Sequence, residues 1–361
     1  MSYFLPEPKS SSSTAKVGIL LTNLGTPDAP NPSALRRFLA EFLSDRRVIE
    51  TPRAIWLPIL HGIILRTRPA KSARKYQKIW SQDGSPLLVY SLKQRDLLRG
   101  YLGEALRKEH IAPDQVVVEI GMRYGNPSIA SGIEKLRAAG VTTIIVLPLY
   151  PQYAASTTGS TYDAIAQHIA RMRSAPEIIL MNRFYDHPSY IRALRQRILH
   201  FWTSEGRPDH LLFSFHGAPE QTHQDGDPYY EQCKKTVTLL MRHEDFKDVR
   251  WSVAFQSRFG KAKWLQPYTT DALKALGKKG VKRVDVACPS FVSDCLETLE
   301  EINIGEREVF LNAGGKTFNM IPCLNDSHPW IAALVEILWP TIQSKLGNMK
   351  TEAVKKPAKI F

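Results

Sequence analysis

The chain has 361 residues, 43% of them hydrophobic, so it is long enough to form two domains or two halves of similar fold. Its 48 basic and 35 acidic residues give a formal net charge of +13, an excess that first suggests nucleic acid as a partner. The apolar stretch 55–65 is interrupted by Pro58, His61 and Gly62. It therefore falls short of the roughly 20 consecutive apolar residues that a membrane-spanning helix needs.

The cysteine and glycine patterns exclude further classes. The cysteines are scattered without a CxxC pair, which favours reduced thiols in a cytoplasmic protein over a disulfide framework or a zinc site. They are Cys233, Cys288, Cys295 and Cys323. The chain also lacks GxGxxG and Walker motifs, so a dinucleotide enzyme is disfavoured.

Short runs of β-branched and apolar residues alternate with amphipathic segments along the chain. The strand-like runs are 17–22, 116–120, 143–147, 178–181, 211–215, 251–255, 283–287 and 318–322. The helix-like segments between them include 130–139, 162–173, 190–202, 229–243 and 270–279. This alternation predicts an α/β fold with parallel sheets flanked by helices.

A faint internal repeat divides this pattern into two halves. One strand is followed by Gly25-Thr-Pro27 and another by Gly217-Ala-Pro219, and later helices end at Gly140 and Gly280, which suit helix C′ positions. The repeat predicts a disordered lead at 1–15, an α/β half at 16–175, a second α/β half at 176–340 and a basic tail at 341–361. The first half also contains an insertion, at about 34–99, that the second half lacks.

The insertion joins the apolar stretch 55–65 to a dense basic cluster. This cluster consists of Arg66, Arg68, Lys71, Arg74, Lys75 and Lys78. Apolar and basic residues in sequence favour contact with anionic lipid or with an amphiphilic acid over contact with nucleic acid.

His216 ends an apolar run, Leu211 to Phe215, and precedes a tight turn. A histidine at the carboxyl end of a buried strand is well placed to exchange a proton near neutral pH, or it only caps the strand through a backbone hydrogen bond. Leu24 occupies the equivalent place in the other half, so the turn itself does not require an imidazole. This favours a functional role for His216.

An acidic stripe follows Pro289. Asp294, Glu297 and Glu301 have the i, i+3, i+7 spacing of one helical face, and oxygen ligands there suit a divalent cation. Asp294 and Glu297 also match a capping box, and acidic residues are common in a first helical turn, so a cap and a solvated face remain the alternative.

Two further segments have open interpretations. The hydroxyl-rich segment from Tyr150 to Ser160 either holds an anionic group at a helix start or only caps that helix. Trp264 lies beside two lysines and is either a stacking platform or a core anchor.

Taken together, several segments resemble the ferrochelatases, class II chelatases, most closely those of the proteobacterial type. The matching segments are Gly18-Ile-Leu-Leu-Thr-Asn-Leu-Gly-Thr-Pro27, 84–86, 121–124, 150–160, 213–216, 226–228, 256–264 and 293–301. The resemblance covers residues 16 to about 340 and implies two Rossmann-like halves with a porphyrin between them. It also implies the activity, which is insertion of ferrous iron into protoporphyrin IX to form protohaem in the last step of haem biosynthesis.

The resemblance assigns roles to particular residues. It implies that His216, Glu297 and Glu301 are catalytic and that His216 and Glu297 meet the metal. The residues that it places around the porphyrin are Asn23, Leu24, Ser85, Arg123, Tyr124, Tyr150, Ser257, Trp264 and Phe291. Arg68 and Lys71 match propionate-binding positions loosely. The insertion corresponds to a lip around the pocket mouth, so we expect a cytoplasmic protein with peripheral membrane contact and no nucleic acid partner.

Two departures from the family pattern matter. Cys295 stands where many members have a histidine directly after the aspartate, so that histidine is not required for the chemistry predicted here. No cysteine follows Cys323, which predicts the absence of the iron–sulfur cluster that some members carry. We expect Fe²⁺ as substrate and no permanently bound cofactor. The alternatives are a chelatase for coproporphyrin or another metal, and a non-catalytic porphyrin- or haem-binding protein.

Overall fold

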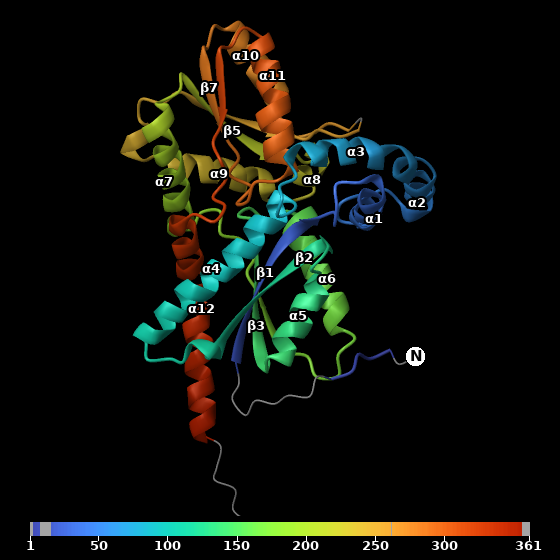
Figure 1. Ribbon diagram of the computed structural model, residues 1–361, viewed down its shortest axis with the longest axis vertical. Coiled ribbons are helices and arrows are strands. Elements are labelled where there is room, and N and C mark those ends of the chain that lie inside the picture. The colour runs from blue at the N-terminus through green and yellow to red at the C-terminus, as the bar shows by residue number, and fades with distance from the viewer. Residues whose placement is uncertain (1–2, 8–15, 261, 356–361) are drawn as a thin grey trace, which may run out of the picture.

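The computed structural model describes residues 3–7, 16–260 and 262–355, and its main feature is a pair of four-stranded parallel sheets (Figure 1). The first sheet has the order β2-β1-β3-β4, and the second has the order β6-β5-β7-β8. Their strands are β1 (Lys16–Thr26), β2 (Val116–Gly125), β3 (Val141–Pro148), β4 (Glu177–Leu180), β5 (His210–His216), β6 (Trp251–Gln256), β7 (Arg283–Ala287) and β8 (Thr317–Met320). The identical strand orders confirm the predicted α/β fold with two similar halves.

Helices connect the parallel strands, as such connections require. The crossover helices are α5 (Ile129–Ala138), α6 (Ser160–Ile169), α7 (Pro188–Glu205), α8 (Glu220–Gln224), α9 (Tyr229–Met241), α10 (Thr269–Lys278) and α11 (Arg307–Asn312), with short turns at Pro113–Gln115 and Glu244–Phe246. Gly140 and Gly280 follow the ends of α5 and α10 with φ of 81° and 82°. These are the left-handed C′ positions that the repeat predicted.

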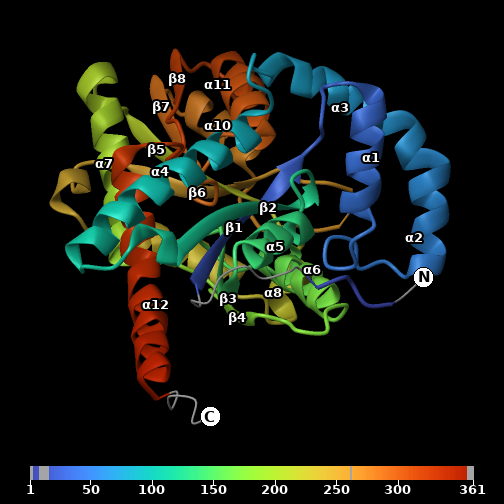
Figure 2. The ribbon, with the colours of Figure 1, turned by 60° about the horizontal axis from the view of Figure 1, so that its bottom comes forward.

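The insertion between β1 and β2 has no counterpart of equal length in the second half. It contains α1 (Pro32–Leu43), α2 (Arg53–Ile59), the π-helical turn η1 (Leu60–Ile64), α3 (Leu65–Ile79) and α4 (Pro86–Lys108). Helices α1 to α3 gather on one side of the molecule, away from α7, and we call them the lip (Figure 2). Asn31 starts the lip by accepting a hydrogen bond from Ala34 N, with Pro32 at the first helical position.

The central strands are buried on both faces, which explains their continuous apolar sequence. Ile19, Leu21 and Ile145 of the first sheet belong to the same buried cluster as Phe213 of the second. The last helix, α12 (His328–Lys355), contacts α7 and α4 as well as β1 and β3, and Trp330 is fully buried there. One core therefore joins the two sheets.

The predicted boundaries need three corrections. β4 pairs with β3, so the first sheet continues past residue 175. The first half therefore includes β4. Helix α12 continues to residue 355, and Ile342 and Leu346 are buried, so residues from 341 are not a free tail. In the lead, Leu5 N donates to Arg171 O at 2.8 Å, so residues 3–7 are ordered against the first half. Residues 1–2, 8–15 and 356–361 lie outside the described residues. Among the described helices, none is long and apolar enough to cross a membrane.

Candidate active site

His216 is the last residue of β5, at the carboxyl end of the second sheet. Its Nδ1 lies 2.6 Å from the carbonyl oxygen of Gly217. Because a carbonyl only accepts, Nδ1 carries the hydrogen, and Nε2 keeps a free lone pair when the ring is neutral. The hydroxyl of Tyr229 donates to the His216 carbonyl at 3.0 Å and holds the backbone in place. The ring is thus oriented to accept a proton at Nε2.

Aromatic side chains flank the imidazole. The ring centroid of Phe291 lies 6.4 Å from that of His216. A Cβ at Gly217 would come within 3.0 Å of the Trp264 ring, so this glycine allows the indole to lie directly against the turn that follows His216. Trp264 is only partly buried, and its indole N–H has no partner among the described residues. This favours the platform interpretation of Trp264 over the core anchor.

The acidic wall of the site is a π-helix, η5 (Glu297–Glu306), which the sequence pattern did not reveal. Its i→i+5 hydrogen bonds widen the turn beyond that of an α-helix. Glu297, Glu301 and Glu306 consequently share one face. In an α-helix Glu306, nine residues after Glu297, would be roughly two and a half turns on and would point the opposite way.

Ser257 fixes Glu301 in this wall. Its backbone N–H and its hydroxyl donate to the two carboxylate oxygens of Glu301 at 2.7 and 2.6 Å, and it adopts a φ of 64° to do so. Burial raises the pKa of Glu301, and the neighbouring Glu297 raises it further, against the lowering effect of the Ser257 hydrogen bonds and of His216. Glu301 is therefore the carboxyl best suited to hold a proton near His216. Ser257, predicted to contact the porphyrin, instead holds a carboxylate.

Glu306 was not predicted as a site residue. One of its oxygens accepts a hydrogen bond from the Thr270 hydroxyl, whereas the other, Oε2, is buried with no partner among the described residues. Burial raises its pKa, and Glu301 contributes to the increase. The sequence could have indicated Glu306 only through its position five residues after Glu301. That spacing places the two side chains on one face only if the helix has π-helical winding.

Glu297 lies in an open pocket of about 670 Å³ between the first sheet, the lip and η5. We call this the lip pocket, and it is lined by Leu24, Gly25, Thr26, Leu35, Phe38, Leu39, Phe42, Arg68, Ser72, Tyr76, Ser85, Leu87, Cys295, Leu296 and Glu297. Its largely apolar lining is typical of small-molecule sites. The structure thus brings together four of the predicted residues, Leu24, Arg68, Ser85 and Glu297. His216 does not line this pocket, and Glu301 is the residue that interacts electrostatically with both His216 and Glu297.

Arg123 and Tyr124 are engaged with protein groups. The Arg123 guanidinium pairs with Asp45, and its Nε donates to the Ser160 hydroxyl at 2.6 Å. Tyr124 is fully buried and donates to Asp45 at 2.8 Å. Burial alone would raise the pKa of Asp45, but the Ser160 and Tyr124 hydroxyls and the Arg123 charge hold it below its ordinary value. Arg123 and Tyr124 therefore already have partners within the protein.

Asn23 has a hydrogen-bond partner in the protein, whereas the Tyr150 hydroxyl has none among the described residues. Asn23 is buried, and its amide donates to Ser91 Oγ at 3.2 Å. The Tyr150 hydroxyl is buried without a partner among the described residues, and burial, with smaller contributions from Tyr124 and Glu297, keeps its pKa well above the ordinary value. Tyr150 therefore stays protonated and has a hydrogen to donate.

In the hydroxyl-rich segment after Tyr150, the backbone N–H groups of Tyr153 and Ala155 already have acceptors, although the buried Thr158 hydroxyl has no partner among the described residues. The segment forms the π-helical turn η3 (Ala155–Gly159), where the Ala155 N–H donates to the Asp227 carboxylate at 2.7 Å. The N–H of Tyr153 donates to the Gln232 side chain at 2.8 Å. Acceptors from the second half occupy these positions, so an external anion does not.

Asp294 lies outside the π-helix that carries the other two residues of the acidic stripe, Glu297 and Glu301. It precedes η5, which has no side-chain cap, so the capping-box interpretation is wrong. Its carboxylate accepts hydrogen bonds from Asn325 Nδ2 at 2.6 Å and from Thr298 Oγ1 at 3.0 Å. Both partners, like Asp294 itself, belong to the second half. Cys295 is buried, and burial together with the nearby Glu297 keeps the pKa of its thiol well above the ordinary value.

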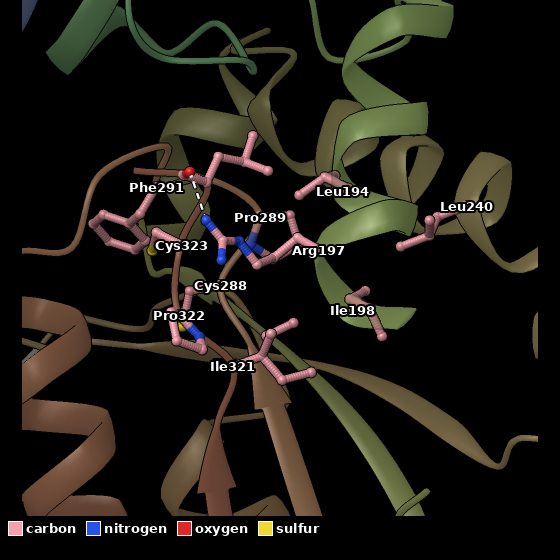
Figure 3. A pocket seen from close by; sticks show the side chains of 12 residues that line it. Leu194, Arg197, Ile198, Leu240, Cys288, Pro289, Phe291, Ile321, Pro322 and Cys323 are labelled. Carbon is pink, nitrogen blue, oxygen red and sulfur yellow. Dashed lines mark hydrogen bonds between the residues drawn. The ribbon is translucent and has the colours of Figure 1, made fainter. Parts of the chain in front are cut away.

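A second, smaller pocket of about 330 Å³ contains none of the acidic residues of η5 (Figure 3). Arg197 extends across it and donates to Leu324 O at 2.8 Å, and Cys288, Phe291 and Cys323 lie around it. In the described part of the chain, no group of three or more His, Cys, Asp or Glu side chains is arranged to hold a metal ion. All four cysteines are free thiols there.

Two parallel sheets of identical order, with a histidine at one strand end and a carboxylate wall beside it, define a chelatase-like α/β protein. The fold resembles that of SirB from Bacillus subtilis with Fe³⁺, with a TM-score of 0.52, 16% identity and coverage of 92% of this chain and 98% of that one. The ferrochelatase family model matches residues 16–341, and the chain belongs to that family.

Curated relatives carry the same family name. A ferrochelatase of Methylibium petroleiphilum is 55% identical, with 93% of each chain covered. A ferrochelatase of Aromatoleum aromaticum is 52% identical, with 96% of this chain and 93% of the relative covered. These findings confirm the family that the sequence motifs indicated.

Proposed function

We propose that this protein is a lyase that inserts Fe²⁺ into protoporphyrin IX, with release of two protons, in the last step of haem biosynthesis. Membership of the ferrochelatase family supports iron insertion into a porphyrin. The observation that carries the assignment of chemistry to residues is the free Nε2 of His216 beside the proton-holding carboxyl of Glu301.

The porphyrin binds in the lip pocket, where Leu24, Phe38 and Phe42 offer apolar contact to a large flat ring. Contact over that area supplies binding energy that offsets bending of the macrocycle, which turns pyrrole nitrogens out of the ring plane. Arg68 lines the same pocket and is placed to pair with a propionate. Protoporphyrin, with two propionates, leaves the rest of its edge apolar, which suits the apolar side of this pocket.

Proton removal falls to the second half. His216 accepts a pyrrole proton at Nε2, and Glu301 takes part in passing it on, because burial raises its pKa and so favours its protonated form more than in an exposed glutamate. Glu297 lies at the boundary between the lip pocket and this acidic wall, so its carboxylate is the oxygen ligand nearest to the bound ring.

Iron meets few protein ligands on this route. A carboxylate from Glu297 and an imidazole from His216 make a mixed, incomplete site that binds Fe²⁺ weakly enough to release it to four pyrrole nitrogens. We also propose that the protein has no permanently bound cofactor and no iron–sulfur cluster, since its cysteines are scattered and none follows Cys323.

We further propose a cytoplasmic protein that touches the membrane surface through the lip and does not bind nucleic acid. Ile55, Ile59 and Ile63 are exposed by 58%, 37% and 57%, and they precede Arg66 and Lys71 in the chain. Exposed apolar residues followed by basic ones suit an anionic lipid surface.

The test is to mix the purified protein with protoporphyrin IX or coproporphyrin and with Fe²⁺ or Zn²⁺, and to follow the absorption change. We expect iron insertion, with protoporphyrin IX used in preference to coproporphyrin. The opposite preference would assign the chain to coproporphyrin. Binding of porphyrin without insertion would indicate a non-catalytic binding protein.

A further inference from the structure

We propose that Glu300 is a positioning residue, which with Lys75 and Lys78 clamps the lip helix α3 to the π-helix η5 and so sets the width of the lip pocket. The inference rests on the proposed binding of the porphyrin in that pocket. We call these three residues the lip clamp.

The contacts of the lip clamp use both oxygens of one carboxylate. Lys75 Nζ lies 2.8 Å from Glu300 Oε2, and Lys78 Nζ lies 3.2 Å from Oε1. The Glu300 side chain is only 9% exposed, whereas the two lysines are exposed by 54% and 52%. A sheltered carboxylate that loses its cations remains poorly solvated, so these pairs matter more than ordinary surface ion pairs.

The position of the lip clamp connects it to the pocket. Lys75 and Lys78 lie three residues apart on one face of α3, and Tyr76 between them lines the lip pocket. Glu297, three residues before Glu300, contributes to the lining of the same pocket from η5. Any change in the distance between α3 and η5 therefore moves two walls of the pocket relative to each other.

Because η5 is a π-helix, contacts with residues outside this helix help to hold it in place. Neighbouring glutamates are held on different sides, since Ser257 binds Glu301 while α3 binds Glu300. A π-helix lacks the usual i→i+4 ladder, so contacts of this kind help to hold it in place. Nearer the start of α3, the Arg68 guanidinium lies 4.5 Å from the centre of the Phe259 ring and gives a second contact between the lip and the second half.

The first experiment removes the negative charge with Glu300→Gln and measures porphyrin insertion at low and high salt. We expect the KM for porphyrin to rise about five- to tenfold at low salt, with kcat within about twofold of wild type. Salt should raise the KM of the wild type more than that of the variant, so that the two values converge, because only the wild type has a clamp to screen in addition to the proposed Arg68–propionate pair. Glu308→Gln removes the same charge from an exposed position shortly after η5 and should change neither parameter.

The second experiment reverses the charges. Glu300→Lys alone should weaken porphyrin binding at least as much as Glu300→Gln, and adding Lys75→Glu and Lys78→Glu should restore the KM to within about threefold of wild type. Far-ultraviolet circular dichroism checks that each variant is folded. An unchanged KM in folded Glu300→Gln, or no recovery in the triple variant, overturns the clamp.

A third variant separates this inference from the proposed binding site. Ser72 lines the lip pocket, so Ser72→Trp should obstruct it and raise the porphyrin KM at least tenfold. If Ser72→Trp raises the KM and Glu300→Gln does not, the clamp is wrong and the pocket assignment stands. If Ser72→Trp leaves the KM unchanged, the porphyrin binds elsewhere, and both the pocket assignment and the clamp are overturned.

Discussion

The two sheets have the same strand order, but the residues at their carboxyl ends behave differently. At the end of β1 and β2, Asp45, Arg123, Tyr124 and Ser160 satisfy one another in a closed network. At the end of β5 and along η5, His216 keeps a free Nε2, and Glu301 and Glu306 have raised pKa values. A duplicated scaffold thus carries a closed hydrogen-bond network in one half and, in the other, the groups to which we assign proton exchange.

The largest expected effect comes from removing the histidine of the second half. His216→Ala should lower kcat by about 10²- to 10⁴-fold, because the general base is lost, and should leave porphyrin affinity within about threefold. Metallation assays and equilibrium porphyrin binding measure the two effects separately. Near-normal turnover would remove His216 from the chemistry.

A transplant control sharpens this result. Leu24→His places an imidazole at the equivalent position of β1, in the lip pocket with Glu297 but without Glu301 among the lining residues. In the His216→Ala background it should recover no more than about threefold of the lost activity. Substantial recovery would mean that the two strand ends are interchangeable.

Glu297→Gln should have the next largest effect. The amide keeps the size of the side chain but removes the charge that meets iron, so we expect kcat to fall by about 10²-fold with a modest change in porphyrin KM. Zn²⁺ and Fe²⁺ insertion should both be affected. A fall confined to porphyrin binding would make Glu297 a wall residue only.

In the first half, Asp45→Asn should affect stability more than chemistry. Removing one charge of a sheltered pair, with side chains 6% and 15% exposed, should lower the free energy of unfolding by about 3 kcal/mol at pH 7. Turnover of the folded variant should stay within about threefold of wild type.

The same variant tests the pKa of Asp45. Because its folded pKa is lowered, the carboxylate stabilises the protein above its ordinary pKa of about 3.9, and this contribution disappears as pH falls through the folded value. Denaturation midpoints of wild type and Asp45→Asn should therefore converge below about pH 4. A gap that is independent of pH would contradict the assignment.

The smallest effect is expected at Cys295. Its thiol is buried with a raised pKa, so it is neither a thiolate ligand nor a proton carrier at neutral pH. Cys295→Ser should keep turnover within about threefold. A collapse of activity in a folded variant would assign the thiol a direct role.

The sequence was sufficient for features that depend on local pattern. The eight strands follow apolar runs, and Gly140 and Gly280 mark helix ends because few other residues adopt a positive φ. The family motifs also located His216 and Glu297. Their catalytic roles remain predictions. The division of the chain into two halves also remains a prediction, apart from the three boundaries that the structure corrects.

What the sequence did not reveal depends on partners far along the chain. No local signal specifies a π-helix at 297–306, whose neighbours Ser257 and Lys75 lie 40 or more residues away. Glu306 was missed for that reason. The family resemblance implied that Arg123 and Tyr124 line the porphyrin pocket, and this stays a prediction. No local signal indicated that Asp45, 78 residues from Arg123, would pair with the guanidinium.

The position of the last described helix affects how the protein folds during its synthesis. α12 is the final described element, yet it covers β1 and β3 from the beginning of the chain as well as α4 and α7 (Figure 1). While the ribosome is still translating, the first half leaves apolar surface uncovered, including the place that Trp330 will occupy. Completion of the core, and with it of the proposed porphyrin site, therefore waits until α12 has been made.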